Sequence, residues 1–335
     1  MQFQVPITIK TLPEGIQYGQ KILLSGSCFT EHIGDRLAEW KFDVLQNPHG
    51  ILFDPASVAS SLVSYIKPRQ YTGNDLFYLN ELWQSWQHHS RFSGMDKEQV
   101  LQQINHSQQQ AHDFLKEADW LIITLGSSFS YRLSAAGATQ SVSNETAVAN
   151  CHRAPAQWFQ KHLMSIEEMN TVLDNCIHQL FHFNKKLQII FTISPVRHIR
   201  DGVTENNRSK ARLIEVVHHL VNKFDRLHYF PAYELVIDVL RDYRFYDIDM
   251  AHPNFAATQF VLEHFSKHCI SSNSLSLMEQ VQQIVTARKH KAFQPATQAH
   301  QQFLKTHAAK AFQLQQQCPY LNFEEEIKFF NGQLK

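Results

Sequence analysis

The alternation of short apolar runs with segments of helical spacing constrains this chain more than any other feature. The apolar runs predict strands over 21–25, 42–45, 120–125, 187–193 and 227–230. Between them, apolar residues recur every three or four positions and predict helices over 29–40, 55–66, 96–117, 165–183, 209–223 and 254–268. Repeated strand–helix units predict an α/β fold whose parallel sheet is covered by helices on both faces. Binding sites in such a fold lie at the carboxyl ends of the strands.

The composition changes near residue 270 and divides the chain in two. Residues 1–270 hold every predicted strand, with a helical insertion near 55–118. A stretch rich in Ser and Asn covers 271–276, and the residues after it are rich in Gln and Lys and carry no strand pattern. We therefore predict that 271–335 form a separate C-terminal helical extension.

Charge and cysteine content exclude several classes of protein. With 31 basic and 31 acidic side chains the formal net charge is zero, which argues against nucleic-acid binding and against an anionic membrane surface. The apolar runs are far shorter than the ~18 residues of a membrane span, and the first residues lack a signal-peptide pattern. We predict a cytoplasmic protein with reduced thiols, because no CxxC pair occurs among its five cysteines: Cys28, Cys151, Cys176, Cys269 and Cys318.

A candidate nucleophile follows the first predicted strand. Gly26, Ser27 and Cys28 form a turn of small residues that leads from the strand into a helix. At a helix N-terminus, backbone N–H groups and the helix dipole lower a thiol pKa or stabilise an oxyanion, so Ser27 or Cys28 is placed to act as a nucleophile. An alternative interpretation is structural: Gly26 and Ser27 form a turn and cap, and Cys28 is a small buried hydrophobic residue.

A candidate base lies just before the last helix of the sheet domain. Asp249 precedes His252 by three residues in a loop, so its carboxylate can accept the ring Nδ1 proton and leave Nε2 free as a general base. The alternative interpretation makes Asp249 a turn cap, and His252 with Asn254 the start of a helix.

Several of these segments resemble known families. The opening turn and the Asp-x-x-His loop resemble those of the SGNH (GDSL-type) hydrolases. From about Pro13 to His268 the chain more closely resembles the GSCFA-domain family, in motifs that occur in the same order. These motifs are Gly26 to Phe29, Asn47 to Gly50, Thr124 to Gly126, Asn150 to His152, Ser194 to His198, Asn207 to Lys210, Tyr229 to Glu234 and Arg241 to Tyr246.

The resemblance to SGNH hydrolases implies a three-layer, flavodoxin-like fold and an acyl-transfer site. The nucleophile position corresponds to Cys28, or to Ser27 if the turn shifts by one residue; His252 corresponds to the base and Asp249 to its orienting partner. The oxyanion donors correspond to Gly50 and to a position near Ser128, where the family's Asn is missing. Asn150 would replace this donor if the segment 131–148 folds back over the site.

Other polar residues are weaker candidates. Arg197, with His198, follows a predicted strand and can bind a substrate carboxylate or phosphate, although a structural role for such arginines is more common. His152 can be a second site histidine or a hydrogen-bonded loop residue. Two pairs of histidines lie four residues apart, but no third ligand accompanies either, so we predict no metal site. These pairs are His178 with His182 and His264 with His268.

Together these features predict an ester hydrolase or acyltransferase that forms an acyl-enzyme at Cys28 or Ser27 and uses no cofactor. The expected substrate is a small-molecule or carbohydrate ester, such as an O-acylated carbohydrate, by analogy with SGNH hydrolases. The alternative is a non-catalytic protein of the same fold that binds a glycan or a partner. A metal-dependent hydrolase is a third and weaker hypothesis.

Overall fold

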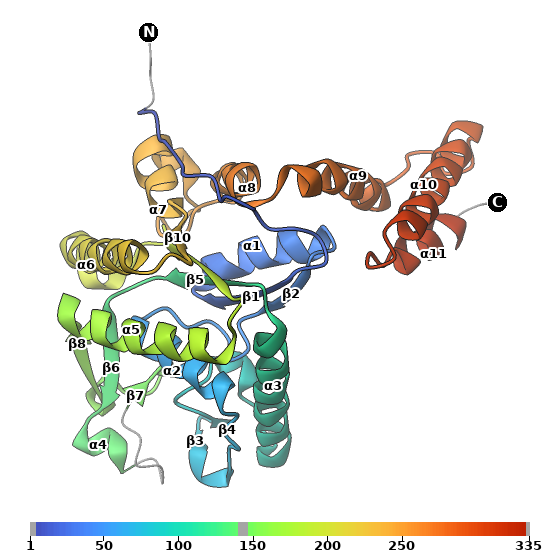
Figure 1. Ribbon diagram of the computed structural model, residues 1–335. Coiled ribbons are helices and arrows are strands. Elements are labelled where there is room, and N and C mark those ends of the chain that lie inside the picture. The colour runs from blue at the N-terminus through green and yellow to red at the C-terminus, as the bar shows by residue number, and fades with distance from the viewer. Residues whose placement is uncertain (1–4, 140–146, 333–335) are drawn as a thin grey trace.

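A computed structural model describes residues 5–139 and 147–332 and has a five-stranded parallel sheet at its centre (Figure 1). The strands are β1 (Lys21–Gly26), β2 (Asp43–Gln46), β5 (Trp120–Leu125), β9 (Gln188–Ile193) and β10 (Leu227–Tyr229). Their spatial order is β2-β1-β5-β9-β10, and all neighbouring pairs are parallel. Counted along the chain, this is the flavodoxin-like order 2-1-3-4-5. The predicted α/β fold is confirmed.

Helices cover both faces of the sheet, because successive side chains of each strand point to opposite sides. Leu23 and Ile123 pack under α2 (Pro55–Ile66), α3 (Lys97–Glu117), α5 (Ile166–Phe183) and α6 (Gly202–Lys223). Ile22 and Ile122 face α1 (Cys28–Glu39) and α8 (Phe255–Cys269). Figure 1 shows α1 and α8 on one side of the sheet and α2 and α5 on the other.

Several short elements have no counterpart in the sequence prediction. The insertion between α2 and α3 also carries an antiparallel hairpin of β3 (Phe77–Leu79) and β4 (Leu82–Gln84). After β5 comes a second sheet in the order β7-β6-β8, from β6 (Phe129–Leu133), β7 (Ala147–Val148) and β8 (Phe159–Leu163). Two short helices, α4 (Ala135–Ala138) and α7 (Ala232–Glu234), complete this set, and a π-helical segment, Leu235–Leu240, continues α7. Of the segment 131–148, residues 140–146 lie outside the described residues.

The C-terminal residues form three further helices with a core of their own. These are α9 (Ser272–Lys289), α10 (Gln298–Gln317) and α11 (Glu324–Gly332), and Figure 1 shows α10 and α11 extending away from the sheet. Helix α9 joins the two cores, since Met278 packs with the sheet core and Val281 with the second. The buried Glu326 of α11 pairs with Lys41 after α1, with 2.9 Å between Oε1 and Nζ. Among the described helices, none is long and apolar enough to cross a bilayer.

Gly26 ends β1 where its backbone touches β5. A Cβ atom at Gly26 would lie 2.3 Å from the Thr124 carbonyl oxygen and 2.8 Å from its nitrogen, and φ is +149°. The Ser27 N–H donates to the same carbonyl at 3.1 Å. Only glycine therefore allows the chain to leave β1 at this point and start α1 immediately.

We expect Gly26→Ala to lower the free energy of unfolding by about 3 kcal/mol, since the added methyl group meets backbone atoms that cannot rotate away. Gly19→Ala is the matched control, because Gly19 also has a positive φ, +84°, but no atom within 4 Å of an added Cβ. Urea unfolding of both variants measures the difference, and equal losses would show that the contact with β5 has no energetic role.

Three buried histidines pack together beside the loop that follows β2. The ring centroids of His49 and His88 lie 4.2 Å apart, and His152 Nε2 donates to the Ser85 carbonyl at 2.8 Å. Burial lowers the pKa of His49 and of His152 to about 4, and it lowers the pKa of His88 well below the usual range. These side chains are neutral in the folded protein at pH 7.

We expect acid to destabilise the protein through this cluster. Because the folded pKa values lie below the unfolded value of about 6.5, the unfolded chain binds more protons, so the stability present above pH 6.5 is lost as the pH falls towards 4. We expect each histidine to lower the free energy of unfolding by about 1 kcal/mol at pH 5.5 relative to pH 7.5. Urea unfolding at pH 7.5 and 5.5 measures this loss, and His152→Gln, whose amide can still donate to Ser85, should reduce it. A pH-independent stability over this range would contradict the assignment.

Candidate active site at the carboxyl ends of the strands

A cavity of about 520 Å³ opens at the carboxyl ends of β1 and β9, beside the loop that precedes α8. Six of the residues singled out in the sequence line this cavity, although they are separated by up to 225 positions, from 27 to 252. They are Ser27, Cys28, Arg197, His198, Asp249 and His252. The strand order reverses between β1 and β5, so the cavity lies at the topological switch point, where ligands bind in such sheets.

Ser27 and Cys28 lie at the start of α1. Ser27 is the N-cap residue, but its hydroxyl caps no N–H group; it is 4% exposed and its Oγ has no hydrogen-bond partner among the described residues. Cys28 is half-buried. Burial raises the pKa of its thiol, and this is opposed by the N–H groups of Phe29 and Cys28 and by the charge of Lys210. Both candidate nucleophiles therefore border the cavity, and within residues 5–139 and 147–332 neither side chain has a hydrogen-bond partner on another element.

Asp249 and His252 form a tight pair in the loop before α8. Asp249 Oδ2 lies 2.6 Å from His252 Nδ1, and its Oδ1 accepts from the N–H groups of Ala251 at 2.9 Å and His252 at 3.0 Å. These hydrogen bonds, led by the His252 N–H, lower the pKa of Asp249 to about 2. An ionised Asp249 accepts the Nδ1 proton and leaves Nε2 as the free nitrogen of the ring.

The pair and the nucleophiles share the cavity without a hydrogen bond between them. Both side chains of the pair are 46% exposed. No hydrogen bond joins His252 to Ser27 or Cys28 within the described residues. The geometry therefore places an oriented imidazole in the lining of the cavity that also holds the two candidate nucleophiles.

Arg197 is held on the wall of the cavity by aromatic rings. Its guanidinium lies 4.0 Å from the ring centroid of Tyr246 and 5.2 Å from that of Tyr243. Its backbone N–H donates to the Ala251 carbonyl, which ties the end of β9 to the Asp249 loop. Arg197 thus has both a positioning contact and a cationic group beside the cavity.

Two predicted oxyanion donors lie elsewhere. The Gly50 N–H donates to the Asn47 carbonyl at 2.7 Å, and Gly50 packs against His89 outside the cavity lining. The Ser128 N–H donates to Ser209 Oγ at 2.8 Å, and the side chain is fully buried. Neither group is free for a substrate, because the Gly50 N–H is used within its own turn and the Ser128 N–H is used by Ser209 on α6.

Asn150 and His152 also lie away from the cavity. Asn150 Oδ1 accepts from the His152 N–H at 2.9 Å, and His152 belongs to the buried histidine cluster beside Trp86. The structure assigns both residues to the packing of the segment after β7. They do not line the cavity that holds Cys28.

Two further residues belong to the site, and of these only Lys210 carries no role in the sequence prediction. His198, predicted together with Arg197, lines the cavity; its ring centroid lies 5.2 Å from that of Phe53 with the ring planes tilted by 49°, and burial lowers the pKa of its ring to about 4. Lys210 is fully buried on α6 beneath the strand ends and donates to the carbonyls of Gly126 and Ser194. The sequence does hold a signal for Lys210, because a lysine occupies the otherwise uncharged buried stripe that continues through Leu213 and Val217.

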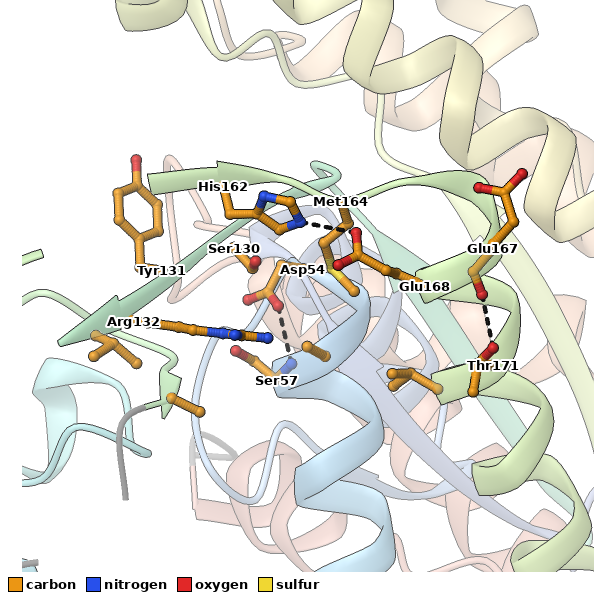
Figure 2. A pocket seen from close by; sticks show the side chains of 14 residues that line it. Asp54, Ser57, Ser130, Tyr131, Arg132, His162, Met164, Glu167, Glu168 and Thr171 are labelled. Carbon is orange, nitrogen blue, oxygen red and sulfur yellow. Dashed lines mark hydrogen bonds and ion pairs between the residues drawn. The ribbon is translucent and has the colours of Figure 1, made fainter. Parts of the chain in front are cut away.

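A second cavity, of about 450 Å³, lies between α2, α5 and the small sheet (Figure 2). Its polar groups are engaged in the fold: Asp54 caps α2 through the Ser57 N–H at 2.9 Å, and His162 pairs with Glu168 at 2.8 Å. No group of three or more His, Cys, Asp or Glu side chains in the described residues is placed to hold a metal ion. The site with the predicted residues is therefore the cavity at the strand ends.

The comparisons with known proteins support one assignment. No curated protein matches the sequence. A solved structure from Streptococcus pneumonia, provisionally described as a platelet activating factor, is 12% identical over 76% of this chain and 85% of its own, with a TM-score of 0.37, too low to support an argument. The model of the GSCFA family matches residues 21–265, and that of the C-terminal domain of GSCFA domain proteins matches 281–335. The chain belongs to the GSCFA family.

Proposed function

We propose that this protein is an ester hydrolase or acyltransferase that works in the manner of the SGNH hydrolases. One observation carries the proposal. The Asp249–His252 pair, joined at 2.6 Å, borders the same cavity as Ser27 and Cys28, which start α1 at the switch point of the sheet. A nucleophile, a base and a group that orients the base are the components of acyl transfer through a covalent intermediate.

The reaction would run in two steps. His252 Nε2 takes the proton of the Cys28 thiol or the Ser27 hydroxyl, and the nucleophile attacks the acyl carbonyl carbon. The ester C–O bond then breaks, and the leaving alcohol takes the proton from His252. In the second step His252 deprotonates water in a hydrolase, or an acceptor hydroxyl in a transferase, and the acyl group leaves the enzyme.

Backbone groups other than those of Gly50 and Ser128 would stabilise the oxyanion. The first N–H groups of α1, those of Cys28 and Phe29, have no backbone acceptor in the part of the chain that the structure describes, as expected for the first turn of a helix. Ile51 lines the cavity, and its N–H has no hydrogen-bond acceptor among the described residues. One such donor contributes a factor of about 10²–10³ in rate.

The cavity favours a small acyl group on a polar carrier. Apolar side chains, Ile51, Phe53 and Val196, line it beside the cations of Arg197 and Arg200. We infer an O-acylated carbohydrate or a related small ester as the substrate class. All five cysteines are free thiols, and a reduced Cys28 fits a reducing compartment such as the cytoplasm.

A second candidate function is binding without catalysis. It is favoured by the absence, among the described residues, of a hydrogen bond from His252 to either nucleophile and by the burial that raises the pKa of Cys28. In that case the cavity would hold a glycan or a partner segment, and Arg197 would supply the main polar contact.

An acetyl-ester assay separates the two functions. We expect His252→Ala, and either Cys28→Ala or Ser27→Ala, to lower kcat/KM by about 10²-fold or more, since general-base and nucleophilic steps contribute at least this much. Asp249→Asn should lower it as well, because the amide no longer fixes the imidazole. Cys318→Ala, at the end of α10, is the control that removes a thiol far from the cavity.

Thermal melts confirm that each variant is folded, and mass spectrometry of a quenched reaction locates the acyl group. If wild type hydrolyses no ester faster than folded His252→Ala across a panel of acyl carbohydrates and small esters, the catalytic proposal fails and the binding function takes its place.

A further inference from the structure

Lys210 is a buried cation without an acidic partner. It is 1% exposed, and its Nζ donates to the carbonyl oxygens of Gly126 and Ser194, each at 2.6 Å. No carboxylate forms an ion pair with Lys210 among the described residues. An ammonium group has three protons to donate, so two carbonyls leave one donor unused. Buried lysines are rare and costly unless a counter-charge compensates them.

The position of Lys210 places its charge beneath the cavity. Gly126 follows β5 and Ser194 follows β9, so the ammonium joins the ends of these two strands, next to the switch point between β1 and β5. An added Cβ at Gly126 would lie 3.5 Å from both Ser27 Cβ and His198 Nε2. Lys210 therefore binds the backbone segment that contacts the start of α1 and the His198 ring.

Cys28 adjoins the backbone that Lys210 holds, since it follows Ser27, whose Cβ faces Gly126. Burial lowers the pKa of Lys210 to about 7, and the Cys28 thiolate acts against this by raising it. In return, Lys210 lowers the pKa of Cys28, although burial, the largest effect, keeps that pKa above its usual value. The other groups facing Lys210 are the neutral ring of Tyr233, 5.9 Å away, and His198, whose protonated form Lys210 disfavours.

We propose that Lys210 is the buried counter-cation of a Cys28 thiolate and that Cys28, rather than Ser27, is the nucleophile of the site. The inference rests on the proposed acyl-transfer function and names the group that activates it. A fixed positive charge would stabilise the Cys28 thiolate as it forms, when His252 takes the thiol proton. A serine hydroxyl needs a hydrogen bond to the base, and Ser27 Oγ has none among the described residues.

The proton balance follows from this arrangement. The Cys28 proton passes to His252, while Lys210 keeps its own protons and remains bound to the two carbonyls. When the thioester forms, the leaving alkoxide takes the proton from His252, and the neutral imidazole then activates water. Lys210 is thus a positioning residue that acts through Cys28, and it does not contact the substrate carbonyl.

The rate at which iodoacetamide alkylates Cys28, followed by mass spectrometry from pH 6 to 10, tests the pair without any ester. We expect Lys210→Gln, which keeps amide donors for the carbonyls but removes the charge, to slow alkylation about tenfold at pH 7.5, equivalent to a rise of about one pKa unit. Lys223→Gln is the matched control, since Lys223 ends the same helix and pairs with Asp174 on the surface. An unchanged profile in folded Lys210→Gln would overturn the proposal.

A reciprocal measurement leaves Lys210 in place. In ¹³C spectra of protein labelled at the lysine ε carbon, we expect a signal that titrates near pH 7 in wild type and at lower pH in Cys28→Ala, because the counter-charge is lost. Cys318→Ala should leave this signal unchanged. If Cys28→Ala also leaves it unchanged, Cys28 is not the partner of Lys210, whatever the stability of the Lys210 variants.

The outcomes separate the inference from the function on which it rests. Coupling between Lys210 and Cys28 without ester turnover would reject the proposed activity and keep the ion pair. Turnover with the acyl group found on Ser27 would reject Cys28 as the nucleophile while the esterase function stands.

Discussion

The backbone contact between β1 and β5 decides where the residues of the site lie. Gly26 ends β1 against the backbone of Thr124, and the Ser27 N–H donates to the Thr124 carbonyl. The chain continues from β1 to one side of the sheet and from β5 to the other, so a crevice opens between them. Because no residue of a loop separates Ser27 from the strand, α1 begins inside this crevice. The unpaired N–H groups of its first turn then lie at the edge that holds Cys28.

The buried groups beneath the crevice are polar, and hydrogen bonds must compensate for their loss of contact with water. Ser209 accepts from the Ser128 N–H at 2.8 Å, and Ser128 Oγ donates to the Ser209 carbonyl at 3.1 Å. One helical position further, Lys210 reaches the ends of β5 and β9. A hydrogen-bonded serine group is a common way to satisfy buried N–H groups, but a carbonyl pair does not neutralise an ammonium. Packing and these hydrogen bonds alone therefore do not explain why the Lys210 ammonium is buried at this position.

The main strands and helices could be predicted because their signals are local. Buried parallel strands such as 120–125 are continuous apolar runs, and the helices between them show regular apolar spacing. The start of α6 at Gly202 rather than 209 was missed, because its first turns carry polar residues such as Asn206, whose side chain binds the His198 N–H. The short strands of the small sheet were missed because five residues or fewer, partly exposed, give no reliable alternation.

The residues of the site also differ in whether the sequence could predict them. The nucleophile turn and the Asp249 loop could be found because each is a short segment with its own geometry, and the sheet brings both to one cavity. The donors at Gly50 and Ser128 could not be judged from sequence, since the availability of an N–H depends on the conformation of its turn: Gly50 has φ +80° and donates back to Asn47. The Asp249 loop is fixed by its own hydrogen bonds and by the Arg197 N–H, whereas the first turn of α1 is fixed by β5. Both segments line one cavity, but no hydrogen bond among the described residues joins His252 to Ser27 or Cys28. A cation fixed at the ends of β5 and β9 does not depend on such a hydrogen bond, so Lys210 would favour the Cys28 thiolate wherever the His252 ring lies.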